Sequence, residues 1–438
     1  MYENVKKLEE AINNAVDVQS EEIYNFLSKY VSFKTINPKL TNQVAISIQE
    51  TRDCHEWVKK KLNEFGCFDE ISMPAVDQNL PNIVAKRNGS REGKGLFFNG
   101  HTDVVPVSEK QEKEWRKMKP WSGEIAENKI WGRGASDMKG GNTAFIWAIK
   151  ILHDLGIKLK GDCIATLVVG EETADKKIGI DAVMQSTKLP KTGIIAEATD
   201  LQICPATMGE FYFSIKIFGK SCNLALRHKT IYPSVYGEDI PGVNAIDLMR
   251  KIQNRLVELE HQWGLYRKHP LMEPGNMSIS ITKIQGGDTY SAIAENCEMI
   301  GGVIYAPDLK YEEVKNEFLE AIDQVVKSDY WLRENPPEIT IPYFIPNKPA
   351  NNLSVNHPLT KVFERARRNV MGGEPAFSTP TSNTNDGNYM VEKGYETITF
   401  GLRENNNHGT NEFIYCEDLL NMIKVYALGI LEWCEWDN

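Results

Sequence analysis

The sequence predicts an α/β protein in which a mixed sheet between helices is interrupted by a smaller α+β segment. Short buried strands alternate with helices up to residue 207 and again from residue 330. Between these limits the apolar residues alternate strictly along several strands. We therefore expect a main domain in two parts, residues 1–207 and 330–438, with residues 208–329 as an inserted domain.

Composition indicates a soluble globular protein. Hydrophobic content of 41% and charged content of 25% are ordinary, and 438 residues allow two or three domains. The net charge of -10 argues against a nucleic-acid partner. No apolar run has the length of a membrane span, and the first residues carry no signal-peptide pattern. Eight scattered cysteines without a Cys-x-x-Cys pair predict reduced thiols in a cytoplasmic protein.

The first part of the main domain begins with helices. Apolar residues at helical spacing predict one helix that stops at Asn37-Pro38 and a second over residues 45–65 that Gly66 closes. The charged segment 108–119 is expected to be a solvated loop without a function.

An imidazole and a carboxylate follow the first buried strand. The run Leu96–Phe98 predicts a strand, and His101 and Asp103 come shortly after it. Ligands of α/β sheets bind beyond the carboxyl ends of strands. A metal-bound histidine usually donates its second ring nitrogen to a carboxylate, a role that suits Asp103. For this pair alone, a polar strand end at the surface is the simpler interpretation.

A glycine-rich turn places Asp137 just ahead of a helix. The turn, residues 132–141, lets the backbone approach another group closely, and a helix is expected over residues 141–155. Asp137 also suits a helix N-cap, and the two roles can coexist.

Two more strands also end in carboxylates. Strand 162–169 leads to Glu171 and Glu172, and strand 193–196 runs into Glu197. Neighbouring carboxylates raise each other's pKa, and a nearby cation removes this penalty. Three successive strands therefore end in groups that a random surface would seldom supply.

The inserted segment has the element order of a small α+β domain. Alternation predicts strands near 211–217, 277–281 and 297–305, and helices are expected over 245–259 and 312–326. This β-α-β-β-α order predicts a ferredoxin-like domain, with an antiparallel sheet covered on one face by two helices. Its edge strands favour pairing with a second copy of the chain.

After residue 330 the α/β pattern returns. Strands are expected over 338–343 and 397–400, and helices over 359–370 and 417–433. His408 lies shortly after the last strand.

The strand-end groups together form a candidate metal site. Two imidazoles and several carboxylates without a thiolate suit Zn²⁺, Co²⁺ or Mn²⁺. Five ligands on two ions, with one carboxylate bridging, leave room for water or substrate, and such a site supplies hydroxide and polarises a carbonyl. The five candidate ligands are His101, Asp137, Glu172, Glu197 and His408.

These motifs resemble the acetylornithine deacetylase, succinyl-diaminopimelate desuccinylase, aminoacylase and glutamate carboxypeptidase family of co-catalytic zinc metallopeptidases. The resemblance spans nearly the whole chain and implies a zinc-peptidase-like catalytic domain with an inserted lid that dimerises. It rests on five motifs: His101-Thr-Asp-Val-Val-Pro, Gly132-Arg-Gly-Ala-Ser-Asp-Met-Lys-Gly-Gly, Glu171-Glu-Thr, Glu197 in Ala-Glu-Ala-Thr, and His408-Gly-Thr-Asn-Glu.

The resemblance also implies a role for each residue. His101 and Glu197 would hold one ion and Glu172 and His408 the other, with Asp137 as the bridge. Glu171 would take a proton from the bridging water and pass it to the leaving nitrogen. Asp103 would orient His101.

Two positions depart from the family. Its lid motif Gly-x-x-x-His has Asn223 in place of the histidine that reaches across a dimer to stabilise the developing oxyanion. An amide can donate a hydrogen bond there but carries no charge, and a simple turn residue is the other interpretation. Ile304 stands where many relatives carry an arginine that binds a substrate carboxylate, a contact that Ile304 cannot supply.

The expected activity is hydrolysis of an amide C–N bond by a cytoplasmic, dimeric two-metal enzyme. Removal of the acyl group from an N-acyl amino acid, as in acetylornithine deacetylase, is the leading expectation. A carboxypeptidase or dipeptidase acting on a small peptide is the nearest alternative, and a carbamoyl-amide or cyclic-ureide-derived substrate is more distant. The rival from another class is a relative that binds but barely hydrolyses, because of Asn223.

Overall fold

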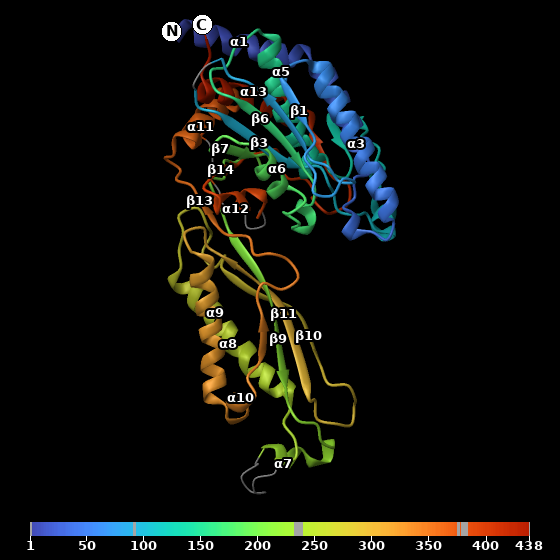
Figure 1. Cartoon of the computed structure of the whole chain (residues 1–438), viewed down its shortest axis with the longest axis vertical. Helices are drawn as coiled ribbons and strands as arrows, with labels where there is room; N and C mark the ends of the chain where they lie inside the picture. The colour runs from blue at the N-terminus through green and yellow to red at the C-terminus, as the bar shows by residue number, and fades with distance from the viewer. Residues whose placement is uncertain (1, 91–92, 232–239, 375–376, 378–383, 438) are drawn as a thin grey trace. The chain divides into compact units, whose positions relative to one another are not determined.

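The computed structural model describes residues 2–90, 93–231, 240–374, 377 and 384–437 (Figure 1). The chain divides into two compact units, Met1–Ala206 with Asn351–Asn438, and Thr207–Ala350. Among the described helices, none is long and apolar enough to cross a membrane. Residues 232–239 of the expected lid lie outside the described residues.

The first unit is built on a six-stranded sheet of order β1-β2-β6-β3-β7-β14. Strands β6, β3, β7 and β14 run parallel, whereas β2 is antiparallel to both of its neighbours. The mixed sheet expected from the sequence is therefore confirmed. Its strands are β1 (Glu70–Ser72), β2 (Ile83–Arg87), β3 (Leu96–His101), β6 (Cys163–Val168), β7 (Thr192–Ile195) and β14 (Glu396–Thr399).

Helices cover both faces of this sheet. Because side chains alternate along a strand, Leu96 and Phe98 of β3 enter the large core on one face, while Phe97 enters a smaller core on the other. The smaller core is closed by α6 (Ile180–Ser186) and α12 (Asp386–Val391). The large core is closed by α1 (Tyr2–Val18), α2 (Ser20–Ser32), α3 (Val44–Phe65), α5 (Gly140–Asp154), α11 (Pro358–Met371) and α13 (Cys416–Cys434).

Local sequence explains most of these boundaries. Gly66 ends α3 in the left-handed conformation, with a φ of 63°. One expectation is wrong: the segment 108–119 contains a short helix, α4 (Glu109–Glu114). Ser108 and Gln111 form a capping box that begins this helix. The high charge of the segment favours a solvated loop and makes this capping motif easy to overlook.

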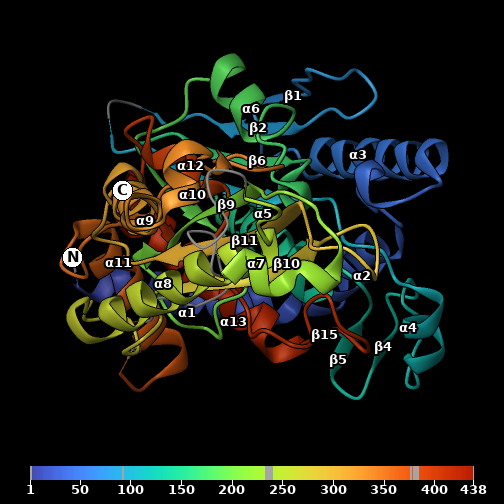
Figure 2. The same ribbon diagram turned by 90° about the horizontal axis from the view of Figure 1, so that it is seen from below.

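A small three-stranded sheet joins distant parts of the first unit (Figure 2). Its central strand β5 (Lys129–Trp131) pairs with β4 (Ile125–Ala126) and with β15 (Phe413–Tyr415). The residues on either side of β5 and β15 are thereby held next to each other, close to the start of α5.

The second unit is a ferredoxin-like domain (Figure 1). Its antiparallel sheet has the order β10-β11-β9-β12, and α8 and α9 pack on one face of it. The elements are β9 (Gly209–Phe218), α7 (Arg227–Ile231), α8 (Ala245–Tyr266), β10 (Ser278–Gly286), β11 (Asn296–Tyr305), α9 (Tyr311–Ser328), α10 (Tyr330–Glu334) and β12 (Glu338–Thr340).

The second boundary of this unit differs from the expected one. Strand β12 was assigned to the main domain, but it pairs with β9 and supplies the last strand of the β-α-β-β-α-β order. The return to the first unit comes with β13 (Asn351–Asn352), which pairs with β8 (Ala206–Thr207). The boundary therefore lies at residue 350 rather than 329, whereas the first boundary differs from the expectation by one residue.

Candidate metal centre

The carboxyl ends of three parallel strands bring the candidate ligands to one edge of the sheet. His101 is the last residue of β3, Glu172 lies in a turn of 3-10 helix (Glu171–Thr173) after β6, and Glu197 follows β7. Because β3 lies between β6 and β7 and runs parallel to both, these residues meet at the same edge.

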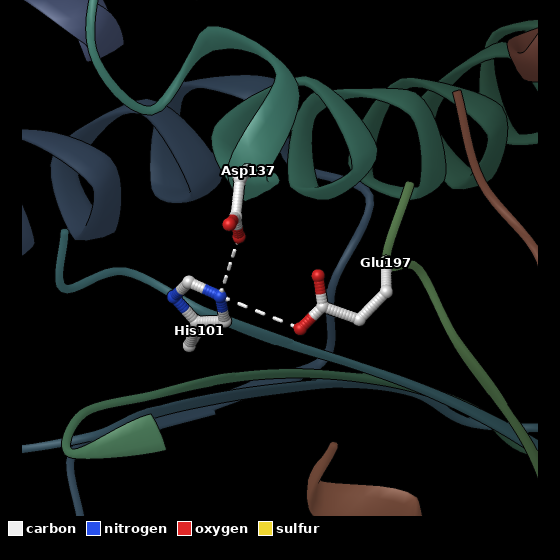
Figure 3. Close-up of side chains that lie close together, drawn as sticks. All are labelled: His101, Asp137 and Glu197. Atoms are coloured by element: carbon white, nitrogen blue, oxygen red, sulfur yellow. Dashed lines mark hydrogen bonds and ion pairs between the residues drawn. The ribbon is translucent and has the colours of Figure 1, made fainter. Parts of the chain in front are cut away.

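His101, Asp137 and Glu197 form the first group of side chains (Figure 3). Nε2 of His101 lies 3.0 Å from Oδ1 of Asp137 and 3.4 Å from Oε1 of Glu197. His101 and Glu197 are buried, with exposed fractions of 2% and 7%. One imidazole nitrogen therefore faces two carboxylates in a space shielded from water.

Asp137, Glu172 and His408 form the second group. Nε2 of His408 lies 3.1 Å from Oδ2 of Asp137 and 3.1 Å from Oε2 of Glu172. The two oxygens of Asp137 thus face two different imidazoles, which is the arrangement that a carboxylate bridging two ions requires. In each group, one ligand atom from every residue lies within 4.8 Å of the others.

The structure does not make Asp137 a helix cap. The N-cap position of α5 belongs to Lys139, and no side chain accepts a capping hydrogen bond there. Asp137 lies in the preceding turn with extended backbone angles, φ -124° and ψ 93°. That conformation directs its carboxylate to the two histidines, so the N-cap interpretation is wrong.

Asp103 acts on its neighbours differently from the expectation. Nδ1 of His101 lies 2.8 Å from the backbone oxygen of Asp103 but 3.9 Å from its carboxylate. The carboxylate instead accepts hydrogen bonds from Asn37 Nδ2 at 2.7 Å and from the backbone N–H groups of Gly170 and Glu172 at 3.0 and 3.3 Å. The backbone oxygen of Asp103 therefore lies where it could accept a hydrogen bond from Nδ1–H of His101, while its side chain binds the backbone of the Glu172 turn.

The charges at the site shift each other's pKa strongly. Burial and the Asp137 carboxylate raise the pKa of Glu172 to about 8, and burial with Asp137 raises the pKa of Glu197 to about 7. Burial opposes protonation of His101, but the Glu197 and Asp137 carboxylates still raise its pKa well above the usual value. Hydrogen bonds to Asp137 and Glu172 raise the pKa of His408 to about 10. The cluster therefore holds protons that a metal ion would have to replace.

The two other expected catalytic residues lie in different units. Glu171 is half-buried beside Glu172, and its charge contributes to the raised pKa of Glu197 and Asp103. Asn223 belongs to the second unit, where it is exposed and its Oδ1 accepts a hydrogen bond from the Ala225 N–H at 2.9 Å. It thereby caps a short 3-10 helix (Leu224–Leu226), which agrees with the turn-residue interpretation.

The sequence does not reveal the contacts by which three polar residues support the ligands. Asn37 is expected from the sequence to stop a helix, and the structure adds that its side chain hydrogen bonds to Asp103. Asn142, in the first turn of α5, donates from Nδ2 to the backbone oxygen of His101 at 2.7 Å. Glu412 was part of a motif, but its partners could not be known before folding.

Sequence comparisons place these features in a known family. The profile of peptidase family M20/M25/M40 matches residues 97–432. The N-formyl-4-amino-5-aminomethyl-2-methylpyrimidine deformylase of Halalkalibacterium halodurans is 30% identical over 431 residues, which cover 96% of each chain. The acetylornithine deacetylase of Pectobacterium carotovorum is 27% identical over 306 residues, covering 68% of this chain and 73% of the relative.

Solved structures agree with the fold. Human carnosine dipeptidase 1 superposes with a TM-score of 0.68 at 16% identity, covering 98% of this chain and 99% of the other. A dinuclear metal binding peptidase of the M20 family from Bacillus subtilis gives a TM-score of 0.59 at 14% identity, covering 94% and 99%. At these identities the agreement concerns the fold alone.

Proposed function

This chain belongs to peptidase family M20/M25/M40, whose hydrolases act on amide C–N bonds, and from this premise we propose that it is a two-metal deacylase. In this proposal His101 and Glu197 would hold one divalent ion, Glu172 and His408 would hold the other, and Asp137 would be shared by both. When bound, such ions polarise a substrate carbonyl and make hydroxide available near neutral pH.

The donor set fits divalent ions such as Zn²⁺, Co²⁺ or Mn²⁺. Imidazole nitrogens and carboxylate oxygens are ligands for all of them, and Zn²⁺ is our first choice. The burial of three carboxylates around two imidazoles is costly without a cation, as the raised pKa values of Glu172 and Glu197 show. A pair of divalent ions would remove this cost.

Glu171 is the proposed general base. It follows a left-handed glycine, Gly170, and precedes the proposed ligand Glu172. Its carboxylate would take the proton from the attacking water and return it to the leaving nitrogen. Asn223 is proposed to donate a hydrogen bond to the developing oxyanion, in place of the family's histidine.

The preferred substrate is an N-formyl amine without a carboxylate, such as an N-formylaminomethyl pyrimidine. The observation that carries this choice is the match to the deformylase, which covers 96% of both chains. Ile304 of β11 supports it, because the family resemblance puts this hydrocarbon side chain where many relatives carry a carboxylate-binding arginine. A neutral substrate does not need that arginine.

Deacylation of an N-acyl amino acid, as by the acetylornithine deacetylases, is the second candidate. Those relatives match over two thirds of the chain at similar identity. The dipeptidase likeness extends only to the fold and adds no argument for a peptide substrate.

We further propose a cytoplasmic homodimer that forms through the second unit. The eight cysteines are all free thiols, which suits a reducing compartment. The edge strand β10 offers a pairing surface for a second copy.

A product assay on the metal-loaded protein separates the candidates. Release of formate from N-formyl-4-amino-5-aminomethyl-2-methylpyrimidine, well above release of acetate from N-acetylornithine, is the expected result. Acetate as the dominant product would favour the second candidate. Binding of substrate with turnover of neither compound, nor of dipeptides, would identify a relative that has lost activity.

A further inference from the structure

Arg133 and Glu412 form an ion pair that is completely removed from water next to the candidate metal centre. Their side chains are 1% and 0% exposed, and Arg133 Nη1 donates to Glu412 Oε2. The antiparallel pairing of β5 with β15 brings them together, because Arg133 lies two residues after β5 and Glu412 directly precedes β15.

The second oxygen of Glu412 binds the backbone that carries Asp137. Oε1 accepts hydrogen bonds from the N–H groups of Gly134 at 3.0 Å, Ser136 at 3.0 Å and Asp137 at 3.2 Å. Three converging donors and one carboxylate oxygen fix the turn just before α5. Among them is the N–H group of the proposed bridging residue itself.

Arg133 makes the corresponding contact with the segment that carries His408. Its Nη2 donates to the backbone oxygen of Gly409 at 2.8 Å, one residue after His408. The Gly132 N–H also donates to the backbone oxygen of Glu412 at 2.9 Å. The pair therefore connects the Asp137 turn to the His408 segment, which are more than 270 residues apart in the sequence.

Stability alone is a weak reason for such a pair. Removing two charges from water costs about as much as their attraction returns, and apolar replacements are often equally stable. A carboxylate at this position accepts hydrogen bonds from three backbone N–H groups and a guanidinium together, which an apolar group cannot do. All of these contacts are to segments that carry a proposed ligand.

We propose that Glu412, held by Arg133, is a positioning residue that sets where the Asp137 carboxylate lies relative to His408. This inference rests on the proposed two-metal function, because the positioned groups are its ligands. Residues that hydrogen bond to metal ligands typically change metal affinity by about 10–100-fold when they are mutated.

Cobalt titration of the metal-free protein tests the inference without an activity assay. In Glu412→Gln, one amide oxygen remains for the backbone donors, but the NH₂ group then faces Arg133. We expect cobalt affinity, measured by competition with a chelator, to fall about 10–100-fold, with a changed visible absorption spectrum. Glu412→Asp keeps the charge but is too short to reach both sets of donors, and it should also lose affinity.

Asp329→Asn is the matched control in the second unit. Asp329 is 5% exposed, accepts from the Trp331 and Leu332 N–H groups, and pairs with Lys251 at 2.6 Å. This variant should lower the thermal midpoint as the Glu412 variants do, while its cobalt affinity and spectrum stay at the wild-type values.

The outcomes distinguish the positioning role of Glu412 from the existence of the metal centre. Cobalt binding by both Glu412 variants with wild-type affinity and spectrum would overturn the positioning role alone. A wild-type protein that takes up no cobalt would instead overturn the metal centre, and the positioning role with it.

Discussion

Asp137 is the residue on which both halves of the candidate centre depend. Its Oδ1 lies 3.0 Å from His101 and its Oδ2 lies 3.1 Å from His408. Burial works against its charge, but hydrogen bonds from the two imidazoles outweigh burial and lower its pKa below the usual value. Near neutral pH, Asp137 is therefore charged, Glu172 is mostly protonated and Glu197 is about half protonated.

This arrangement predicts how metal affinity depends on pH. Glu172 and Glu197, with pKa values of about 8 and about 7 in the metal-free protein, must lose their protons before they bind an ion. His408, with a pKa of about 10, must lose its proton as well. Affinity for Zn²⁺ should therefore decrease as the pH falls from about 10 to about 6, and binding should release protons. Calorimetry in two buffers of different ionisation enthalpy measures this release. Affinity that is constant over this range, without proton release, would contradict the assignment of the ligands.

Asn223 tests whether the chain has lost part of the oxyanion site. If it occupies the position of the family's histidine, Asn223→His restores a donor that can carry charge. We expect kcat to rise on the order of 10²–10³-fold with little change in KM, because one such donor typically has this effect. Steady-state kinetics on the substrate found by the product assay measure both constants. An unchanged or lower kcat would show that Asn223 only caps its own turn.

At the scale of elements, close contact between α5 and β7 places two ligands next to each other. A Cβ atom on Gly141, in the first turn of α5, would lie 2.1 Å from the backbone oxygen of Ala196, just before Glu197. No side chain fits at that distance, so the glycine allows the Asp137 turn and the Glu197 strand end to approach.

Gly141→Ala should therefore push α5 away from the end of β7. We expect a loss of about 1–3 kcal/mol in the free energy of unfolding, together with weaker metal binding. Gly264→Ala is the control, since it lies in α8, where the nearest atom would be 3.9 Å from the new Cβ. That variant should gain about 0.5–1 kcal/mol. Chemical denaturation measures both, and equal stability of the two variants would argue against the close contact.

The elements also show what could be predicted from the sequence. The spacing of apolar residues and the positions of glycines predict the buried strands of the main sheet. They also predict that His101, Glu172 and Glu197 follow the ends of these strands. Strand β12 was assigned to the wrong domain, because its three residues carry no sign of the strand with which they pair. The carboxylate of Asp103 and the pairing of Arg133 with Glu412 depend on contacts between distant segments, which no local pattern encodes.

At the scale of the whole molecule, the proposed dimer depends on the edge strand of the second unit. Ile284 of β10 is 44% exposed on this edge strand. In Ile284→Lys the charge should block pairing, and light scattering should then show a monomer where the wild type is a dimer. Ile125→Lys, at a residue that is 42% exposed in the first unit, should remain dimeric. A wild-type protein that is monomeric and fully active at every dilution would contradict the proposed dimer.

The metal content of the purified protein, measured together with turnover, tests the central claim most directly. We expect about two divalent ions per chain, activity that a chelator abolishes, and recovery when Zn²⁺, Co²⁺ or Mn²⁺ is added. Glu171→Ala should keep both ions but lose turnover, because Glu171 moves a proton and is not a ligand. Full activity in exhaustively demetallated protein, or loss of the ions from Glu171→Ala, would contradict this assignment of the site.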